Sequence, residues 1–85
     1  MTILEKYDNA FMEMLSVDKA ALNENLVFES VDTWDSVGHM SLIAAIEDAF
    51  DIMLETDDII DFSSYDKGKE ILSEKYDVKF WLFPT

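Results

Sequence analysis

The strongest constraint on the fold is the spacing of apolar residues, which recur at three- and four-residue steps in several separate segments. In residues 36–50, the apolar residues with this spacing are Leu42, Ile43, Ile46 and Phe50. Such a period places the apolar side chains on one side of an α-helix. No segment shows convincing β alternation. The pattern predicts an all-α protein: a four-helix bundle with a long loop between helices 1 and 2 and a short helix 3.

The first helix is expected over residues 2–15, and a long connection over 16–35 precedes the second helix. A helical turn is expected at 18–22. The predicted buried stripe of the first helix is Ile3, Leu4, Tyr7, Phe11, Met14 and Leu15. A loop this long is usually functional or disordered. Four apolar residues in it favour order, because they are spaced as anchors over the core: Leu22, Leu26, Phe28 and Val31.

After the second helix we expect an extended piece at 52–54 and a short third helix that begins at 56–58. Ser63 or Ser64 is expected to cap a fourth helix that reaches about residue 76. The apolar residues assigned to these two helices are Ile59, Ile60 and Phe62, then Tyr65, Ile71 and Leu72. The chain then reads as one domain over 1–79, followed by an aromatic C-terminal tail over 80–85 that carries Phe80, Trp81 and Phe83.

The formal net charge of -13 over 85 residues restricts the partners. There is no arginine, and no lysine lies between Lys19 and Lys67. Nucleic-acid and anionic-membrane binding need a basic face, so we expect no nucleic acid and no membrane among the partners. Long-range attraction instead favours proteins with basic docking surfaces. We expect a monomer.

The chain has no cysteine, which excludes disulfides, thiolate catalysis and cysteine zinc sites. No apolar run approaches the roughly 20 residues of a membrane span, and the N-terminus does not resemble a signal peptide. We expect a cytoplasmic protein. The acidic clusters do not match a calcium-binding EF-hand loop, so no metal site is expected.

Ser36 lies at the start of the second helix, and its side chain is expected to be in solvent. Asp35 or Ser36 can cap this helix by accepting a hydrogen bond from its first N–H groups. Asp35, Ser36 and His39 do not predict a catalytic triad, because neighbouring positions at one helix start do not give the required geometry.

This segment resembles the acyl carrier protein family, in which Asp-Ser-Leu corresponds to Asp35-Ser36-Val37. The similarity covers nearly the whole chain, to about residue 76. It is supported by Trp34 before the triplet and by two further runs, Gly38-His39-Met40…Leu42-Ile43…Ala45-Ile46-Glu47-Asp48…Phe50 and Ile52…Leu54…Asp57-Asp58-Ile59…Phe62-Ser63-Ser64. The sequence departs from the family at Gly38 and Ser41, which occupy positions that are often acidic in fatty-acid carriers.

The resemblance implies that a phosphopantetheinyl transferase attaches 4'-phosphopantetheine from coenzyme A to Ser36. The arm would carry acyl groups as thioesters to the acyl-loading and acyl-transfer enzymes of fatty-acid, polyketide or related biosynthesis. The protein would not be an enzyme. Since the chain has no thiol, any thioester requires such an arm. The alternative is a non-carrier acidic helical adaptor that binds basic protein partners.

Helix geometry suggests which residues would contact partners. With the apolar face of the second helix in the core, the more outward residues are Val37, Met40, Ala44, Glu47 and Asp48, and Asp35 precedes them. These six are the predicted partner-binding residues, as a small apolar patch with flanking acids suits transient docking. The space between Phe11, Leu42, Ile46, Phe62 and Leu72 could be ordinary core or could shelter an acyl chain, and sequence leaves both open.

Overall fold

The computed structural model describes residues 2–80. All regular secondary structure in this part of the chain is helical. Its elements are α1 (Ile3–Leu15), the 3-10 turn η1 (Lys19–Ala21), α2 (Ser36–Phe50), α3 (Thr56–Asp61) and α4 (Tyr65–Lys75). The described residues form no β-strand beyond one isolated bridge between Val27 and Ser64. The expected all-helical class, the long first connection and the short third helix are therefore confirmed.

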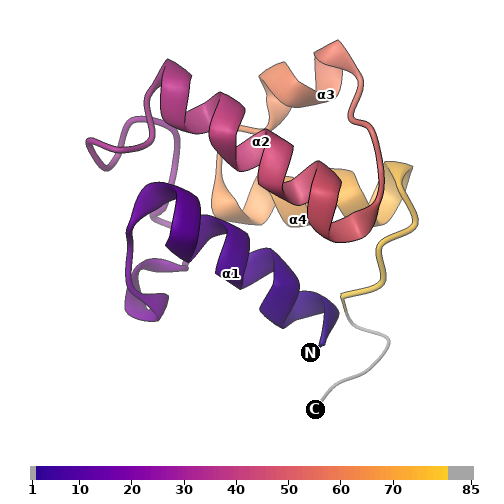
Figure 1. The fold of residues 1–85 in the computed structure, drawn as a ribbon, viewed down its shortest axis with the longest axis horizontal. Helices are drawn as coiled ribbons and strands as arrows, with labels where there is room; N and C mark the ends of the chain where they lie inside the picture. Colours follow the sequence, from indigo (N-terminus) through magenta and orange to yellow (C-terminus); the bar gives the residue numbers. More distant parts are fainter. Residues whose placement is uncertain (1, 81–85) are drawn as a thin grey trace.

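The helices form a small bundle (Figure 1). Helices α1 and α2 lie side by side and run in opposite directions, α4 lies behind them, and α3 lies across α2 from α1. None of the helices in residues 2–80 is both long enough and apolar enough to cross a membrane.

Helix α1 begins with a capping box. The Thr2 hydroxyl accepts a hydrogen bond from the Glu5 N–H, and the Glu5 carboxylate accepts one from the Thr2 N–H. This pair satisfies two N–H groups that the helix start would leave without partners. It also lowers the pKa of Glu5, through the hydrogen bonds from the backbone and side chain of Thr2.

The predicted stripe of α1 is correct at its centre and wrong at two positions. Tyr7, Phe11 and Leu15 are completely buried. Leu4 and Met14, however, remain 40% and 39% exposed, because they lie at the edges of the stripe. Asp8, which does not belong to the predicted stripe, is buried as well.

Asp8 is tolerated there because it has a partner. The Tyr65 hydroxyl donates a hydrogen bond of 2.5 Å to Asp8 Oδ1, and the Tyr7 hydroxyl donates one of 2.6 Å to the Tyr65 carbonyl. Burial, followed by the hydrogen bond to Asp8, raises the pKa of Tyr65. These two bonds join α1 to the start of α4.

The bundle core is tightly packed and rich in aromatic residues. Gly68 on α4 allows this packing, because an added Cβ would lie 2.3 Å from the Tyr7 hydroxyl and 2.4 Å from the Phe62 ring. Sequence analysis left open whether the space between five apolar residues is ordinary core or could shelter an acyl chain. All five are completely buried members of this core: Phe11, Leu42, Ile46, Phe62 and Leu72.

The long connection is ordered by packing and by backbone hydrogen bonds, as the predicted anchors suggested. Leu26 is buried, and Leu22, Phe28 and Val31 pack partly buried against the core. The Phe28 N–H donates to the Ser63 carbonyl at 2.8 Å, and the Tyr65 N–H donates to the Leu26 carbonyl at 2.9 Å. The connection is therefore tied to the segment between α3 and α4.

The remaining predictions divide between α3, α4 and the tail. Ser64 caps α4, and Tyr65, Ile71 and Leu72 are buried as expected. Of the apolar residues assigned to the third helix, Phe62 is completely buried, whereas the Ile60 side chain is 71% exposed. In the extended piece Leu54 is buried and Met53 points outward. Of the predicted tail, residue 80 is described, and residues 81–85 lie outside the described residues.

Candidate functional site

Ser36 is the first residue of α2, and it is exposed. The residue before it, Asp35, is the N-cap. Its carboxylate oxygen Oδ1 accepts a hydrogen bond of 2.8 Å from the Gly38 N–H. Of the two expected capping candidates, the structure therefore selects Asp35. This assigns the cap to Asp35 and leaves the Ser36 hydroxyl available at the surface.

The connection before Ser36 presses closely against the first turn of α2. A Cβ added to Gly38 would lie only 1.9 Å from the Thr33 carbonyl oxygen. Only glycine fits this approach without a shift of the backbone. The Thr33 hydroxyl in turn donates a hydrogen bond of 2.6 Å to the Leu15 carbonyl at the end of α1. Ser36 is thus held by a loop with fixed contacts on both sides.

Trp34 lies beneath this helix start and is completely buried. Its indole N–H donates a hydrogen bond of 3.0 Å to Nδ1 of His39, and the two rings stack with their planes 17° apart. An indole N–H can only donate, so Nδ1 of His39 must accept. The proton of the neutral ring then lies on Nε2, which is 2.8 Å from the Ile59 carbonyl and donates to it.

Both ring nitrogens of His39 are therefore engaged by groups other than the Ser36 hydroxyl. The histidine joins the buried indole, helix α2 and helix α3. Sequence reasoning used Trp34 only as support for the family resemblance and missed its burial. A signal was present, because Trp34 and His39 occupy the N′ and N4 positions whose side chains form the hydrophobic staple of a helix start.

A cavity of about 350 Å³ opens beside Ser36, between α2 and α3. Its walls are mainly apolar and include Phe28, Met40, Ile59 and Ile60, while Ser36 and Ser63 add hydroxyl groups. The cavity differs from the interhelical space considered from sequence. Of the five core residues named there, this cavity contacts only Phe62.

The predicted partner-binding residues of α2 divide into two groups. Val37 and Met40 are 76% and 55% exposed, and Ala44 and Asp48 are also exposed. The spacing of three and four residues places all four on one side of the helix. Ile60 of α3 extends this surface, since both Met40 and Ile60 border the cavity beside Ser36.

The other two predicted partner-binding residues have structural contacts. Asp35 is the N-cap of α2. Glu47 is only partly exposed, and its Oε2 accepts a hydrogen bond of 2.9 Å from the Leu54 N–H. Glu47 therefore holds the extended piece against the end of α2. Substitutions of these two residues would change local structure as well as surface charge.

Within residues 2–80, no group of three or more His, Cys, Asp or Glu side chains is arranged to hold a metal ion. The chain has no match among protein-family models, curated proteins or solved structures. The geometry around Ser36 and the sequence pattern that contains it are the basis for a functional assignment.

Proposed function

We propose that the protein is an acyl carrier whose Ser36 hydroxyl takes a 4'-phosphopantetheine arm from coenzyme A, in a reaction catalysed by a phosphopantetheinyl transferase. In this step the Ser36 oxygen forms a phosphoester bond to the arm, the pyrophosphate linkage of coenzyme A breaks, adenosine 3',5'-bisphosphate leaves, and the transferase takes up the hydroxyl proton. The single observation that carries this proposal is the exposed Ser36 at the first position of α2, with the cap supplied by Asp35. The bound arm supplies a terminal thiol on which acyl groups are held as thioesters.

The surroundings of Ser36 support this role physically. The attachment residue of a carrier must be reachable by a second enzyme and must also be held in one place. Ser36 is exposed, and the contacts of Thr33, Trp34 and Gly38 fix the backbone on which it sits. The backbone N–H groups and dipole of a helix start also favour a phosphodiester at this position.

The cavity between α2 and α3 offers apolar side chains next to the proposed attachment point. Phe28, Met40 and Ile60 are the residues of this chain that would contact apolar parts of an attached group there. Burial of apolar surface is favourable by roughly 25 cal/mol per Å², so even partial contact would bias where the arm rests.

The exposed side of α2 supports docking to partner enzymes. It combines the apolar side chains of Val37 and Met40 with the carboxylate of Asp48, in a chain of net charge -13. Partners with a basic and partly apolar surface would be attracted over a distance and held by a small apolar contact. Transferases, acyl-loading enzymes and acyl-transfer enzymes are the proposed partners.

The decisive experiment incubates the apo protein with coenzyme A, Mg²⁺ and a broad-specificity phosphopantetheinyl transferase, and then measures the intact mass. The expected result is a gain of one phosphopantetheine. Ser36→Ala should abolish the gain. Ser41→Ala is the matched control, because Ser41 is also an exposed serine on α2. It should keep the full gain.

The same measurement separates the carrier from the alternative function of an acidic helical adaptor. An adaptor would gain no mass with any transferase. A gain that persists in Ser36→Ala would place the modification elsewhere and would overturn the assignment of Ser36. Circular dichroism of both variants, with unchanged helical signal, confirms that each result comes from the hydroxyl and not from unfolding.

A further inference from the structure

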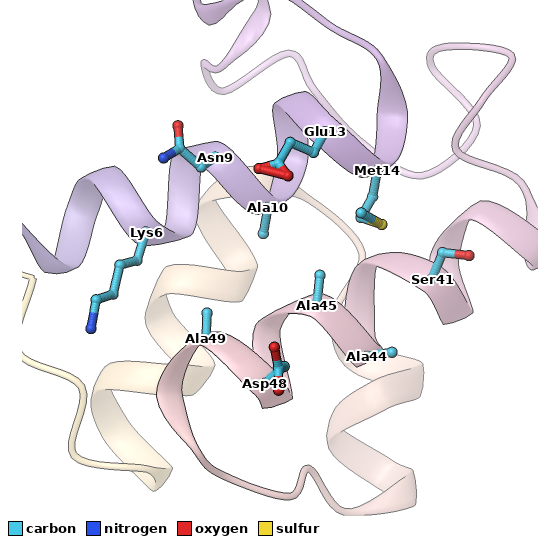
Figure 2. A pocket seen from close by; sticks show the side chains of 10 residues that line it. All are labelled: Lys6, Asn9, Ala10, Glu13, Met14, Ser41, Ala44, Ala45, Asp48 and Ala49. Carbon is cyan, nitrogen blue, oxygen red and sulfur yellow. The ribbon is translucent and has the colours of Figure 1, made fainter. Parts of the chain in front are cut away.

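A second hollow lies on the opposite side of α2 from α3, in the groove between α1 and α2. Its volume is about 680 Å³. Figure 2 shows that Ala10 of α1 points across this groove toward Ala45 and Ala49 of α2. Because these side chains are single methyl groups, they leave the space between the two helices incompletely filled. The floor of the groove is therefore apolar and shallow, and another helix can approach it closely.

The rims of this groove carry charged side chains. Glu13 of α1 and Asp48 of α2 border it from its two walls, and Lys6 borders it near the start of α1. All three side chains are exposed. Within residues 2–80, none of the three forms an ion pair with another residue. Their charges can therefore act on a molecule that enters the groove.

The charge around the groove restricts its occupant. A second copy of this chain would bring another net charge of -13 toward the two acids, and an anionic lipid surface would meet the same repulsion. A basic segment of a partner protein is attracted instead. The two walls are helices, whose backbone groups are paired within each helix, so they offer no edge to an added strand. The arrangement fits the mode in which an amphipathic helix lies in a groove.

We propose that the groove between α1 and α2 docks an amphipathic helix of a partner protein, with small apolar residues on its buried face and lysine or arginine on both flanks. The flanking cations pair with Glu13 on one side and with Asp48 on the other. Lys6 precedes Glu13 by seven residues, or about 10 Å along α1. The partner helix therefore carries an acidic residue about two turns from the cation that meets Glu13.

This inference does not rest on the proposed function. None of the residues that line the groove also lines the cavity beside Ser36. Asp48 belongs to the predicted partner-binding residues as well, whereas Glu13 lies on α1 and does not. Glu13 is therefore the residue whose substitution tests the groove separately from the exposed side of α2.

The test is solution NMR of the full chain, isotope-labelled and titrated with two synthetic peptides. The probe has about 18 residues, because shorter isolated helices are marginal in water. It carries alanine and leucine on one face, lysine on both flanks, and one glutamate two turns from a flanking lysine. The control peptide keeps the apolar face and has glutamate in place of every lysine.

The expected result is a saturable shift of the amide resonances of Ala10, Glu13, Ala45 and Asp48 with the probe and no shift with the control peptide. Absence of binding overturns the proposal, and so does equal binding of the two peptides. Shifts centred on Val37 and the α3 side of the molecule would place the peptide outside the groove, which also overturns it. A spectrum of the chain alone that changes on dilution would assign the groove to a second copy, with the same consequence.

A pair of charge variants gives an independent readout from the same titration. Glu13→Lys should weaken binding of the probe about tenfold, because attraction at one rim becomes repulsion. Glu74→Lys is the matched control, since Glu74 is an exposed acid of α4 that does not line the groove, and its replacement changes the net charge by the same amount. It should leave the affinity nearly unchanged. Equal weakening by the two variants would show that only the total charge attracts the probe, and the proposal would be wrong.

Discussion

At the residue scale, Gly38 shows how one missing side chain positions the candidate site. Alanine normally stabilises a helix by about 1 kcal/mol relative to glycine. Here an alanine Cβ would lie 1.9 Å from the Thr33 carbonyl oxygen, closer than any real contact. The free-energy cost of this steric conflict is larger than the gain in helix propensity.

We therefore expect Gly38→Ala to lower the free energy of unfolding, measured by urea denaturation at neutral pH. It should also slow modification of Ser36, since the loop before the helix must move. Ser41→Ala on the exposed side of the same helix is the control for propensity, and it should be neutral or mildly stabilising. A stabilised Gly38→Ala protein would show that Thr33 yields easily and that the loop is not fixed.

His39 is the second residue whose role is set by its contacts. It accepts from the buried Trp34 indole and donates to the Ile59 carbonyl. His39→Leu keeps the approximate size but leaves a buried donor unpaired, which costs roughly 1–3 kcal/mol. The expected loss of stability is measured by chemical denaturation, with tryptophan fluorescence as the signal.

His39→Asn offers the matched variant, because its side-chain oxygen can accept from Trp34 in place of Nδ1. It should recover part of the stability that His39→Leu loses. Equal losses in the two variants would mean that ring packing, not the hydrogen bond, accounts for the contribution of His39.

At the element scale, α3 is only six residues long and depends on its neighbours. Asp58 provides the connection to the end of α4. Its Oδ1 accepts a hydrogen bond of 2.6 Å from Lys75, and its Oδ2 accepts one of 2.5 Å from the Tyr76 hydroxyl. Both bonds lower the pKa of Asp58 below its ordinary value of 3.8, and the bond from Lys75 makes the larger contribution.

A lowered carboxylate pKa means that the native state holds the ionised form more strongly than the unfolded chain does. The contribution to stability is complete above about pH 4 and is lost as the pH falls through the lowered pKa of Asp58. Asp58→Asn should therefore lower the melting temperature at pH 7, and the difference from the parent protein should shrink at more acidic pH.

The control for this pH profile is Asp57→Asn, in the adjacent exposed position of the same helix. It removes the same formal charge without the two hydrogen bonds. If the stability difference caused by Asp58→Asn stayed constant down to strongly acidic pH, the ionised carboxylate would not be the source of the connection between α3 and α4.

Helix positions could be predicted from sequence because each helix buries a regularly spaced face. The prediction for α2 held at Leu42, Ile43 and Ile46, where apolar residues lie at the centre of that face. Periodicity was less informative at the edges of a stripe, where Leu4 and Met14 stay partly exposed. The bounds of a face depend on which neighbour covers it, and sequence spacing does not contain that information.

The candidate site was predictable only in part for a related reason. Ser36 and its helix start follow from local signals of capping and apolar spacing. The burial of Asp8 depends on Tyr65, which lies 57 residues away, and the cavity beside Ser36 depends on how α3 meets α2. Such long-range pairings arise from packing, so a local sequence pattern cannot specify them.

At the scale of the whole molecule, the position of charge matters as well as its amount. The six lysines lie in the sequence before residue 20 and after residue 66. The only side chains of α2 that carry a full charge at neutral pH are those of Glu47 and Asp48. If the carrier proposal holds, the transferase should recognise this side of the molecule through its basic surface. Asp48 is the best residue for a test, because it is exposed, whereas Glu47 also holds Leu54.

Asp48→Lys should slow phosphopantetheine transfer at low salt, mainly by weakening association. Asp18→Lys is matched to it in charge change and exposure, and the Asp18 side chain makes no capping hydrogen bond to η1. Both variants change the net charge by the same amount, so any difference between their rates reports location. Because ions screen exposed charges over about 8 Å at physiological ionic strength, the difference should shrink as salt is added. Equal rates for the two variants at low salt would show that only the total charge guides encounter, and the docking surface would then have to lie away from the exposed side of α2.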